Sequence, residues 1–144
     1  MTSPADVARA YLRSFDTRDP ASIAALVTDD FDNQQTSALG ASSTGRTEYR
    51  DRLAGFLAAF DGLHYDPIEL VAGAGDVVAI RYRMTARYDG HAVDIPGVMM
   101  IEIRGDLIAR RTDFWDSMTF LAQTGDGPAD HDPTHRTGGD AHAG

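Results

Sequence analysis

The sequence predicts an α+β fold in which a cone-like, curved antiparallel sheet and three N-terminal helices enclose a mostly apolar pocket. Before Gly62 the apolar residues recur at helical spacing, whereas beyond Leu63 they form strand-like runs separated by turn residues. Because these runs exceed the usual strand length of about 5–6 residues, strong twist and curvature are expected. A curved sheet under helices leaves a concavity for a small molecule.

Three segments with one apolar face predict the helices. The first is expected to begin at Pro4, because Ser3 suits the N-cap and proline suits the first helical position. A shorter helix is expected from Pro20, and the third from about Arg46 to Phe60. Between the last two, the sequence indicates a short strand at 31–35 and a polar loop at 36–45.

The second half of the chain predicts a four-stranded antiparallel meander. Three turn signals, at 73–76, 89–90 and 105–106, contain Gly beside small or acidic residues. They divide the chain into runs at about 63–72, 77–88, 91–103 and 107–120. Pro67 and the pair Pro96-Gly97 are expected at bulges or bends.

Charge and composition exclude several classes of partner and site. The net charge of −9 disfavours nucleic acids and anionic membrane surfaces, which require clustered Lys and Arg. The absence of cysteine excludes disulfides and thiolate zinc sites. The N-terminus shows no basic segment followed by an apolar run, so a cytoplasmic location is expected. Neither a metal nor a cofactor is expected.

The 144 residues suit one domain, which we place at 1–121. Residues 122–144 contain almost nothing apolar and are expected to form a disordered polar tail. The tail histidines His131, His135 and His142 are either simply solvated or able to take up metal ions adventitiously.

The segment around Asp113 is the most informative for chemistry. Strand alternation puts Asp113 on the same face as Trp115, the only tryptophan, and Asp116 on the other. If that face lines the pocket, Asp113 is a candidate general base. Alternatively, Asp113 forms a surface salt bridge with Arg110 or Arg111.

The strand at 77–88 leaves two orientations open. Its apolar residues Val78, Ile80, Tyr82 and Met84 alternate with arginines that include Arg81 and Arg83. In one reading the arginines face water. In the other the apolar face contacts a second subunit, and Arg81 enters the cavity beside Asp113.

The order of elements resembles the nuclear transport factor 2-like superfamily and, within it, the SnoaL-like group. The resemblance covers about residues 4–121, and the segments that carry it are AYLRSFDTRDPASIAALVTDDF, GRTEYR and IEIRGDLIARRTDFWD. It implies a conical pocket and a homodimer that pairs through the outer sheet face. It therefore favours the orientation in which Arg81 points inward.

Three enzyme families of this superfamily imply different roles. Similarity to SnoaL-type polyketide cyclases implies that Asp113 is the general acid/base. Limonene epoxide hydrolases hold a water with three residues, whose places resemble Phe31, Asn33 and Asp113. However, their Arg-x-Asp motif here reads Arg81-Tyr82-Arg83, which disfavours epoxide hydrolysis. The ketosteroid isomerase tyrosine resembles Tyr11, but that family's base and oxyanion-hole acid would fall near Gln35 and Met99.

The leading hypothesis is a cofactor-independent cyclase or isomerase acting on an apolar carbonyl substrate. Asp113 removes a proton next to the carbonyl, and Asn33, Tyr11 or Arg81 stabilises the enolate oxygen. The expected substrate-binding residues are Phe31, Trp115, Met99, Phe56 and Arg83. The alternatives are a non-catalytic binding or dimerisation domain, and a hydrolase that activates water with Asp113 and Asn33. A hydrogen bond from Asn33 or Arg81 to Asp113 favours the enzyme, whereas an Asp113 held wholly in salt bridges favours the binding domain.

Overall fold

A computed structural model describes residues 2–125 of the chain. The helices are α1 (Pro4–Ser14), the 3-10 turn η1 (Phe15–Thr17), α2 (Pro20–Ala24), α3 (Arg46–Ala59) and α4 (Ser117–Gln123). The strands are β1 (Val27–Gln35), β2 (Ser43–Thr44), β3 (Phe60–Ala72), β4 (Val77–Tyr88), β5 (His91–Arg104) and β6 (Leu107–Trp115). The predicted tail lies outside the described residues from residue 126 onward.

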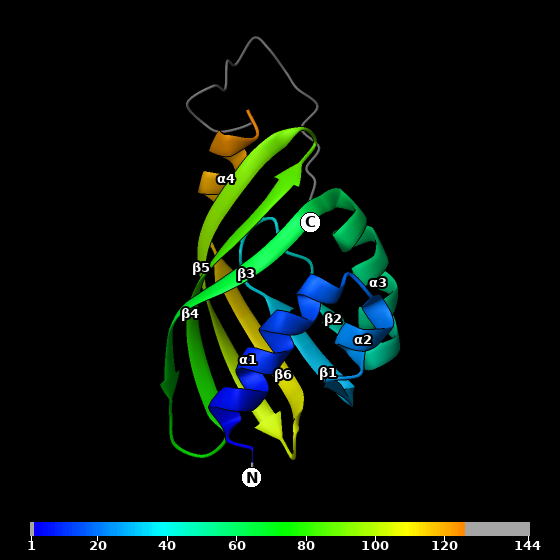
Figure 1. The fold of residues 1–144 in the computed structure, drawn as a ribbon, viewed down its shortest axis with the longest axis vertical. Coiled ribbons are helices and arrows are strands. Elements are labelled where there is room, and N and C mark those ends of the chain that lie inside the picture. The colour runs from blue at the N-terminus through cyan, green and yellow to red at the C-terminus, as the bar shows by residue number, and fades with distance from the viewer. Residues whose placement is uncertain (1, 126–144) are drawn as a thin grey trace.

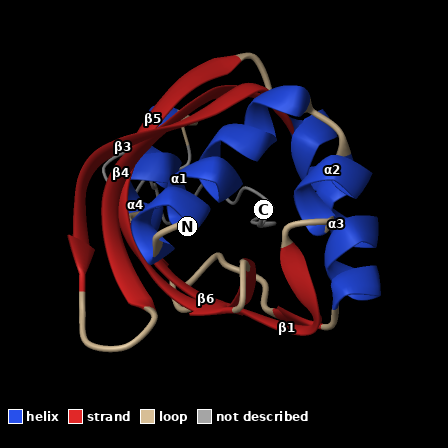
Figure 2. Cartoon of the chain, turned by 60° about the horizontal axis from the view of Figure 1, so that its bottom comes forward, coloured by secondary structure: helices blue, strands red, loops and turns tan. Residues whose placement is uncertain are grey.

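A single six-stranded sheet in the order β2-β1-β6-β5-β4-β3 forms the body of the fold (Figure 1). The strands β3 to β6 form the predicted antiparallel meander, and β1 adds to β6 in parallel. In Figure 2 the sheet bends into an arc, with α1 inside it and α2 and α3 on its open side. The predicted α+β class, with helices over a curved sheet, is confirmed.

The helices begin where their capping residues predict. The Ser3 side chain accepts a hydrogen bond from the backbone N–H of Asp6, whose carboxylate accepts one from the Ser3 N–H, so a complete capping box starts α1. The Asp19 side chain accepts from the N–H of Ala21 and caps α2. The apolar face of α1 is buried and packs against β3.

Turn residues define the hairpins. Asp89 and Gly90 both have positive φ, 49° and 79°, as a type I′ turn between β4 and β5 requires. The expected irregularity at Pro67 is confirmed, because the β3–β4 register shifts between Pro67 and Glu69. By contrast, the β4–β5 ladder passes Pro96 and Gly97 without a register shift, so of the expected bulge or bend no bulge forms there.

Several element boundaries differ from the prediction. The strand β2 lies inside the loop expected at 36–45, and β3 begins at Phe60 rather than near residue 63. The last strand ends at Trp115 rather than near residue 120, because the Asp116 carboxylate accepts from the N–H of Thr119 and caps α4. The strand expected at 31–35 begins earlier, at Val27.

The orientation of β4 decides which residues reach the interior. Its apolar residues are buried on the concave face: Val78, Ile80, Tyr82 and Met84 are at most 8% exposed. The prediction that they form an outer dimer contact is therefore wrong. Arg81 and Arg83 point outward instead, where their side chains remain 57% and 49% exposed. Burying the apolar stripe under the helices stabilises the fold, whereas burying two guanidinium groups would destabilise it.

In the part of the chain that the structure describes, no helix is both long enough and apolar enough to cross a membrane.

Candidate functional site

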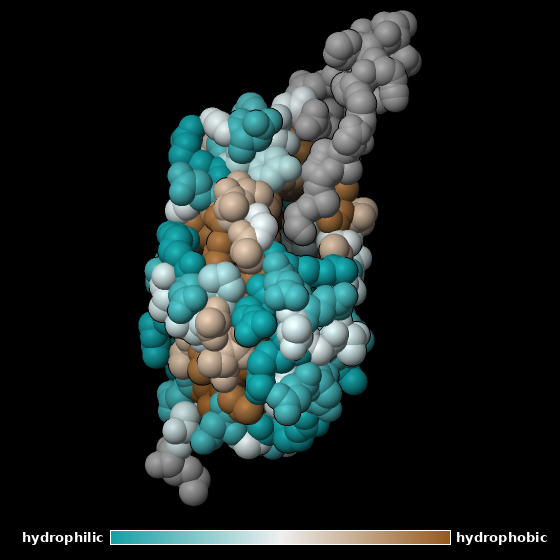
Figure 3. All heavy atoms as spheres, turned by 90° about the vertical axis from the view of Figure 1, so that its right-hand side faces the viewer, coloured by the Kyte–Doolittle hydropathy of each residue, from teal (hydrophilic) through white to brown (hydrophobic). Residues whose placement is uncertain are grey.

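A cavity of about 610 Å³ lies between α3 and the concave face of the sheet. Aromatic side chains dominate its lining and include Phe15, Tyr49, Phe56, Phe60, Tyr65, Tyr82, Tyr88, Trp115 and Phe120. Its polar groups come mainly from β1 and β6: Asn33, Gln35, Arg111 and Asp113. Figure 3 views the side that bears α2 and α3, where apolar areas in brown alternate with hydrophilic residues. A large apolar cavity with a few convergent polar groups is the usual form of a small-molecule site.

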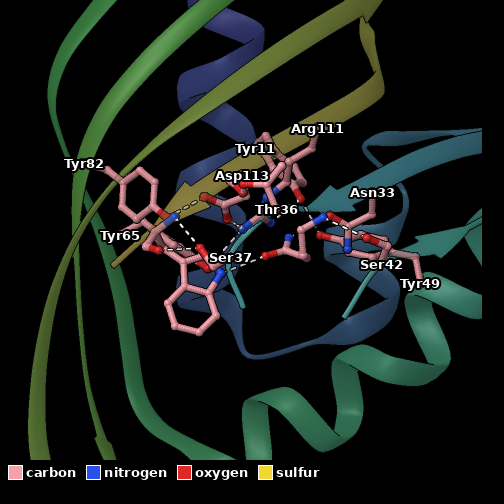
Figure 4. Close-up of polar contacts among 12 residues, drawn as sticks. Tyr11, Asn33, Thr36, Ser37, Ser42, Tyr49, Tyr65, Tyr82, Arg111 and Asp113 are labelled. Carbon is pink, nitrogen blue, oxygen red and sulfur yellow. Dashed lines mark hydrogen bonds and ion pairs between the residues drawn. The ribbon is translucent and has the colours of Figure 1, made fainter. Parts of the chain in front are cut away.

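Asp113 on β6 is the central acid of this site. It is 2% exposed, and its Oδ1 accepts a hydrogen bond of 2.6 Å from the Tyr82 hydroxyl (Figure 4). Its Oδ2 accepts a 2.6 Å charge-assisted bond from Nη2 of Arg111. A carboxylate has about four lone-pair sites, so each oxygen retains capacity for a ligand.

Arg111 connects Asp113 to a group of buried phenols. Its Nη1 donates to the Tyr11 hydroxyl at 2.9 Å, and its Nη2 donates to the Tyr65 hydroxyl at 3.2 Å. Tyr11 in turn shares a hydrogen bond with Tyr49 (Figure 4). The guanidinium carbon lies 5.8 Å from the Tyr11 and Phe15 ring centroids and 5.6 Å from that of Tyr65. This aromatic cage and the carboxylate stabilise a cation that burial would otherwise exclude.

Burial also controls the protonation of this cluster. Burial raises the pKa of Tyr49 well above its ordinary value and raises that of Tyr65 to about 12. Burial and the Asp113 charge raise the pKa of Tyr82. For Arg111, burial lowers the pKa, but Tyr11, Tyr65 and Asp113 outweigh it, so the pKa lies well above its usual range. Tyr49, Tyr65 and Tyr82 therefore remain neutral hydrogen-bond donors beside the permanently charged Arg111 guanidinium.

A second polar row runs along β1. Asn33 and Gln35 pair with Arg111 and Asp113, respectively, in the parallel β1–β6 register. The Trp115 indole Nε1 donates to Gln35 Oε1 at 3.1 Å, and Gln35 Nε2 donates to Asn33 Oδ1 at 3.0 Å. The two amides therefore lie beside the ion pair on the cavity wall.

The structure separates the predicted site residues into three groups. Asp113, Asn33, Phe56 and Trp115 line the cavity. Tyr11, Phe31 and Met99 are fully buried in the core outside the lining; Tyr11 contacts Arg111, and Phe31 packs on the Tyr49 ring. Arg81 and Arg83 form outer-face ion pairs with Glu69 and Asp94, so the inward Arg81 and a substrate contact by Arg83 are both wrong.

Five polar site residues were absent from the predicted set: Gln35, Tyr49, Tyr65, Tyr82 and Arg111. Alternation could have identified two of them, since Arg111 shares the parity of Asp113 and Tyr82 shares that of Val78 and Ile80. Tyr49 lies on the apolar stripe of α3 with Leu53 and Phe56, but neither its pattern nor that of Tyr65 shows which buried group the hydroxyl meets. That contact follows from the packing of α3 on β1 and of β3 on α1.

The described residues contain no group of three or more His, Cys, Asp or Glu side chains that could hold a metal ion.

Comparison with known proteins shows which family the chain resembles. The model of the SnoaL-like domain matches residues 8–111, more than half of the chain. No curated protein sequence matches the chain significantly. Many solved structures do match it.

Three solved structures illustrate the similarity. A hypothetical protein from Catenulispora acidiphila with a ketosteroid isomerase-like fold, in complex with trimethylamine, is 25% identical, with a TM-score of 0.78 over 92% of this chain and 100% of its own. A SnoaL-like polyketide cyclase, so named provisionally, from Shewanella putrefaciens is 16% identical, with a TM-score of 0.76 over 86% and 97%. TerC, co-crystallised with polyporic acid, is 19% identical, with a TM-score of 0.72 over 83% and 96%. At 16% and 19% identity, the Shewanella protein and TerC show only that they share the fold of this chain.

Proposed function

Because the chain belongs to the SnoaL-like domain family, whose solved relatives share its fold, we propose that it is a cofactor-independent acid/base enzyme acting on an apolar carbonyl compound. The observation that carries this proposal is the position of Asp113, a buried carboxylate on the cavity wall that is oriented by Tyr82 and Arg111. Two structural neighbours that carry the provisional name polyketide cyclase support the same reaction class.

The proposed step begins with proton transfer. An Asp113 oxygen takes a proton from the carbon next to the substrate carbonyl, and the electron pair of that C–H bond forms an enolate. The negative charge moves from Asp113 to the enolate oxygen, so the cavity holds one anion before and after the step. In an isomerisation, protonated Asp113 returns the proton to a different carbon of the conjugated enolate. In a cyclisation, the enolate carbon attacks a second carbonyl carbon, and the oxygen of that carbonyl takes the electron pair of its C=O bond and the proton from Asp113.

Stabilisation of the enolate oxygen is assigned to donors on the cavity wall. Arg81 is excluded by its outward position, and the Tyr11 hydroxyl is engaged with Arg111 and Tyr49. Asn33, Tyr49 and Tyr65 remain as candidates, because all three line the cavity and carry N–H or O–H donors. The aromatic lining suits a flat, apolar substrate body.

Hydrogen–deuterium exchange tests this proposal. In D₂O, the purified protein is expected to accelerate the exchange of C–H protons next to the carbonyl of aromatic ketones. Proton NMR measures the rate of this exchange. Asp113→Asn should abolish the acceleration, whereas Asp66→Asn, the same change at an exposed site on β3, should preserve it. Tyr82→Phe keeps the carboxylate and should retain partial rate. Full exchange by a folded Asp113→Asn protein would refute the mechanism.

A non-catalytic binding domain is the second candidate, and one observation favours it. Asp113 has an ion pair with Arg111 as its strongest contact, and neither Asn33 nor Arg81 donates to it among the described residues. A thermal-shift screen that includes trimethylamine and polyporic acid, the ligands of two neighbours, distinguishes the candidates. Stabilisation without exchange or turnover of any ketone would favour binding alone. Water activation for epoxide hydrolysis is third, because Asp113 is the only carboxyl group among the described cavity-lining residues, which leaves no second acid to protonate the epoxide oxygen.

We also propose a homodimer formed through the outer sheet face, in the cytoplasm. Val98, Met100 and Phe114, on the adjacent strands β5 and β6, support this dimer, since they remain 37%, 39% and 48% exposed.

A further inference from the structure

The side-chain amides of Gln35 and Asn33 form a row along β1, here called the β1 amide row. This row begins at the Trp115 indole N–H, which can only donate a hydrogen bond. The Trp115 indole N–H has no acceptor capacity, so the Gln35 atom facing it at 3.1 Å must be the amide oxygen. The opposite end of the same amide is then the NH₂ group. It donates to Asn33 at 3.0 Å, so the Asn33 atom that receives it must also be the oxygen. Each amide orientation therefore follows from the indole rather than from an arbitrary choice between oxygen and nitrogen.

This chain of hydrogen bonds leaves the Asn33 NH₂ group at its end. Within residues 2–125 no side chain or backbone acceptor bonds to Asn33 Nδ2, although the residue is only 9% exposed and lines the cavity. Two N–H donors thus lie at the cavity wall beside the Arg111–Asp113 pair. Donors in such a position favour a ligand that brings an acceptor.

We infer that Gln35 is a positioning residue that holds Asn33 as a hydrogen-bond donor, so that the site selects ligands with a carbonyl-type oxygen beside β1. Gln35 acts through Asn33, and Trp115 sets the direction of both. This inference rests on the cavity being the ligand site of the proposed function, but it does not depend on proton removal by Asp113.

The change Gln35→Glu reverses the direction of these hydrogen bonds. At pH 8 the carboxylate that this substitution introduces can only accept hydrogen bonds, so it accepts from Trp115 and from the Asn33 NH₂ group. Asn33 must then rotate its amide and present its oxygen to the cavity. The matched control is Gln34→Glu, which adds the same charge one residue away on an exposed side chain.

The first measurement uses the ligand-free, full-length protein. NMR of ¹⁵N-labelled samples follows the Trp115 indole N–H and the side-chain NH₂ groups of Asn33. In Gln35→Glu the Asn33 amide protons should exchange with water at least about tenfold more slowly than in the wild type, because they become hydrogen-bonded. The indole signal should remain protected. Unchanged Asn33 exchange in a folded Gln35→Glu protein overturns the inference.

The second measurement compares two ligands of equal shape. 2-Acetylnaphthalene and 2-isopropenylnaphthalene differ only in a C=O against a C=CH₂ group, so their affinity ratio reports acceptor recognition. The wild type and Gln34→Glu should prefer the ketone, and Gln35→Glu should lower the ratio by about tenfold. Gln35→Met, which releases Asn33 without reversing it, should lower the ratio by about threefold. An equal ratio in all variants overturns the selection.

The two proposals fail separately. If Asp113 is not a base, Asp113→Asn retains deuterium exchange while the Asn33 signals still respond to Gln35→Glu. If Gln35 does not set the orientation of the Asn33 amide, the Asn33 signals do not change in Gln35→Glu, whatever the effect of Asp113→Asn.

Discussion

Arg111 and Asp113 lie two residues apart on the inner face of β6 and form a 2.6 Å ion pair, with side chains only 5% and 3% exposed. Such a pair holds the site together without being a large net source of stability, because both charges lose their hydration. Removing one partner, however, leaves the other charge buried and uncompensated. The pair therefore links the stability of the fold to the chemistry of the cavity.

Arg111→Met is expected to lower the free energy of unfolding by about 3–5 kcal/mol, since Asp113 keeps its burial and loses its cation. The double variant Arg111→Met/Asp113→Leu should recover more than half of that loss. Urea denaturation of the wild type, both single variants and the double variant measures the coupling. Additive losses would contradict a coupled pair.

Gly97 is expected to be indispensable for the position of Tyr82. A Cβ at this site would lie 2.5 Å from Tyr82 Cζ and 2.9 Å from its Cε2, directly across the β4–β5 ladder. Gly97→Ala should therefore displace the ring from Asp113 and lower the free energy of unfolding by about 1–3 kcal/mol. Gly55→Ala on α3, where an added Cβ meets nothing within 4 Å, serves as the control and should be neutral or stabilising. Equal effects of the two substitutions would argue against this packing.

The buried phenols predict a loss of stability at alkaline pH. Burial raises the pKa of Tyr65 from 10.0 to about 12, so between these values the unfolded chain loses a proton that the folded protein keeps. The contribution of Tyr65 to the free energy of unfolding should therefore be constant below about pH 10 and then fall, by up to about 1.4 kcal/mol per pH unit. Urea denaturation from about pH 8 to 11 measures the slope, which Tyr65→Phe should reduce. A slope that Tyr65→Phe leaves unchanged would exclude Tyr65 as a source.

Phe114→Asp is expected to dissociate the proposed homodimer. It places a charge in the centre of the exposed apolar residues of β5 and β6 and should raise the dimer dissociation constant by about 100-fold or more. Met118→Asp on α4, at an apolar residue that is 55% exposed, is the matched control and should leave the dimer intact. Light scattering across a concentration series distinguishes the species. A wild type that stays monomeric at high concentration would refute the dimer.

Local chemistry explains why much of the fold could be predicted. The N-caps Ser3 and Asp19 and the Asp89-Gly90 turn act over a few residues, so their sequence patterns are enough to locate α1, α2 and the β4–β5 hairpin. The alternation at 111–115 likewise grouped Asp113 with Trp115, and both line the cavity. The end of β6 could not be predicted, because the sequence around Asp116 is also compatible with a strand. Only the structure shows that the Asp116 carboxylate caps α4.

The sequence by itself determined the periods, the turns and the parity of each strand, because these depend on neighbours along the chain. Only the tertiary structure decided which face of β4 is concave, and with it whether Tyr82 or Arg81 meets Asp113. Likewise, Arg110 and Arg111 are chemically equal in the sequence, yet one pairs with acids on the outer surface and the other is buried among phenols. The physical reason is that a buried charge is stable only where partners from distant segments converge on it, and that convergence arises from the curvature of the sheet.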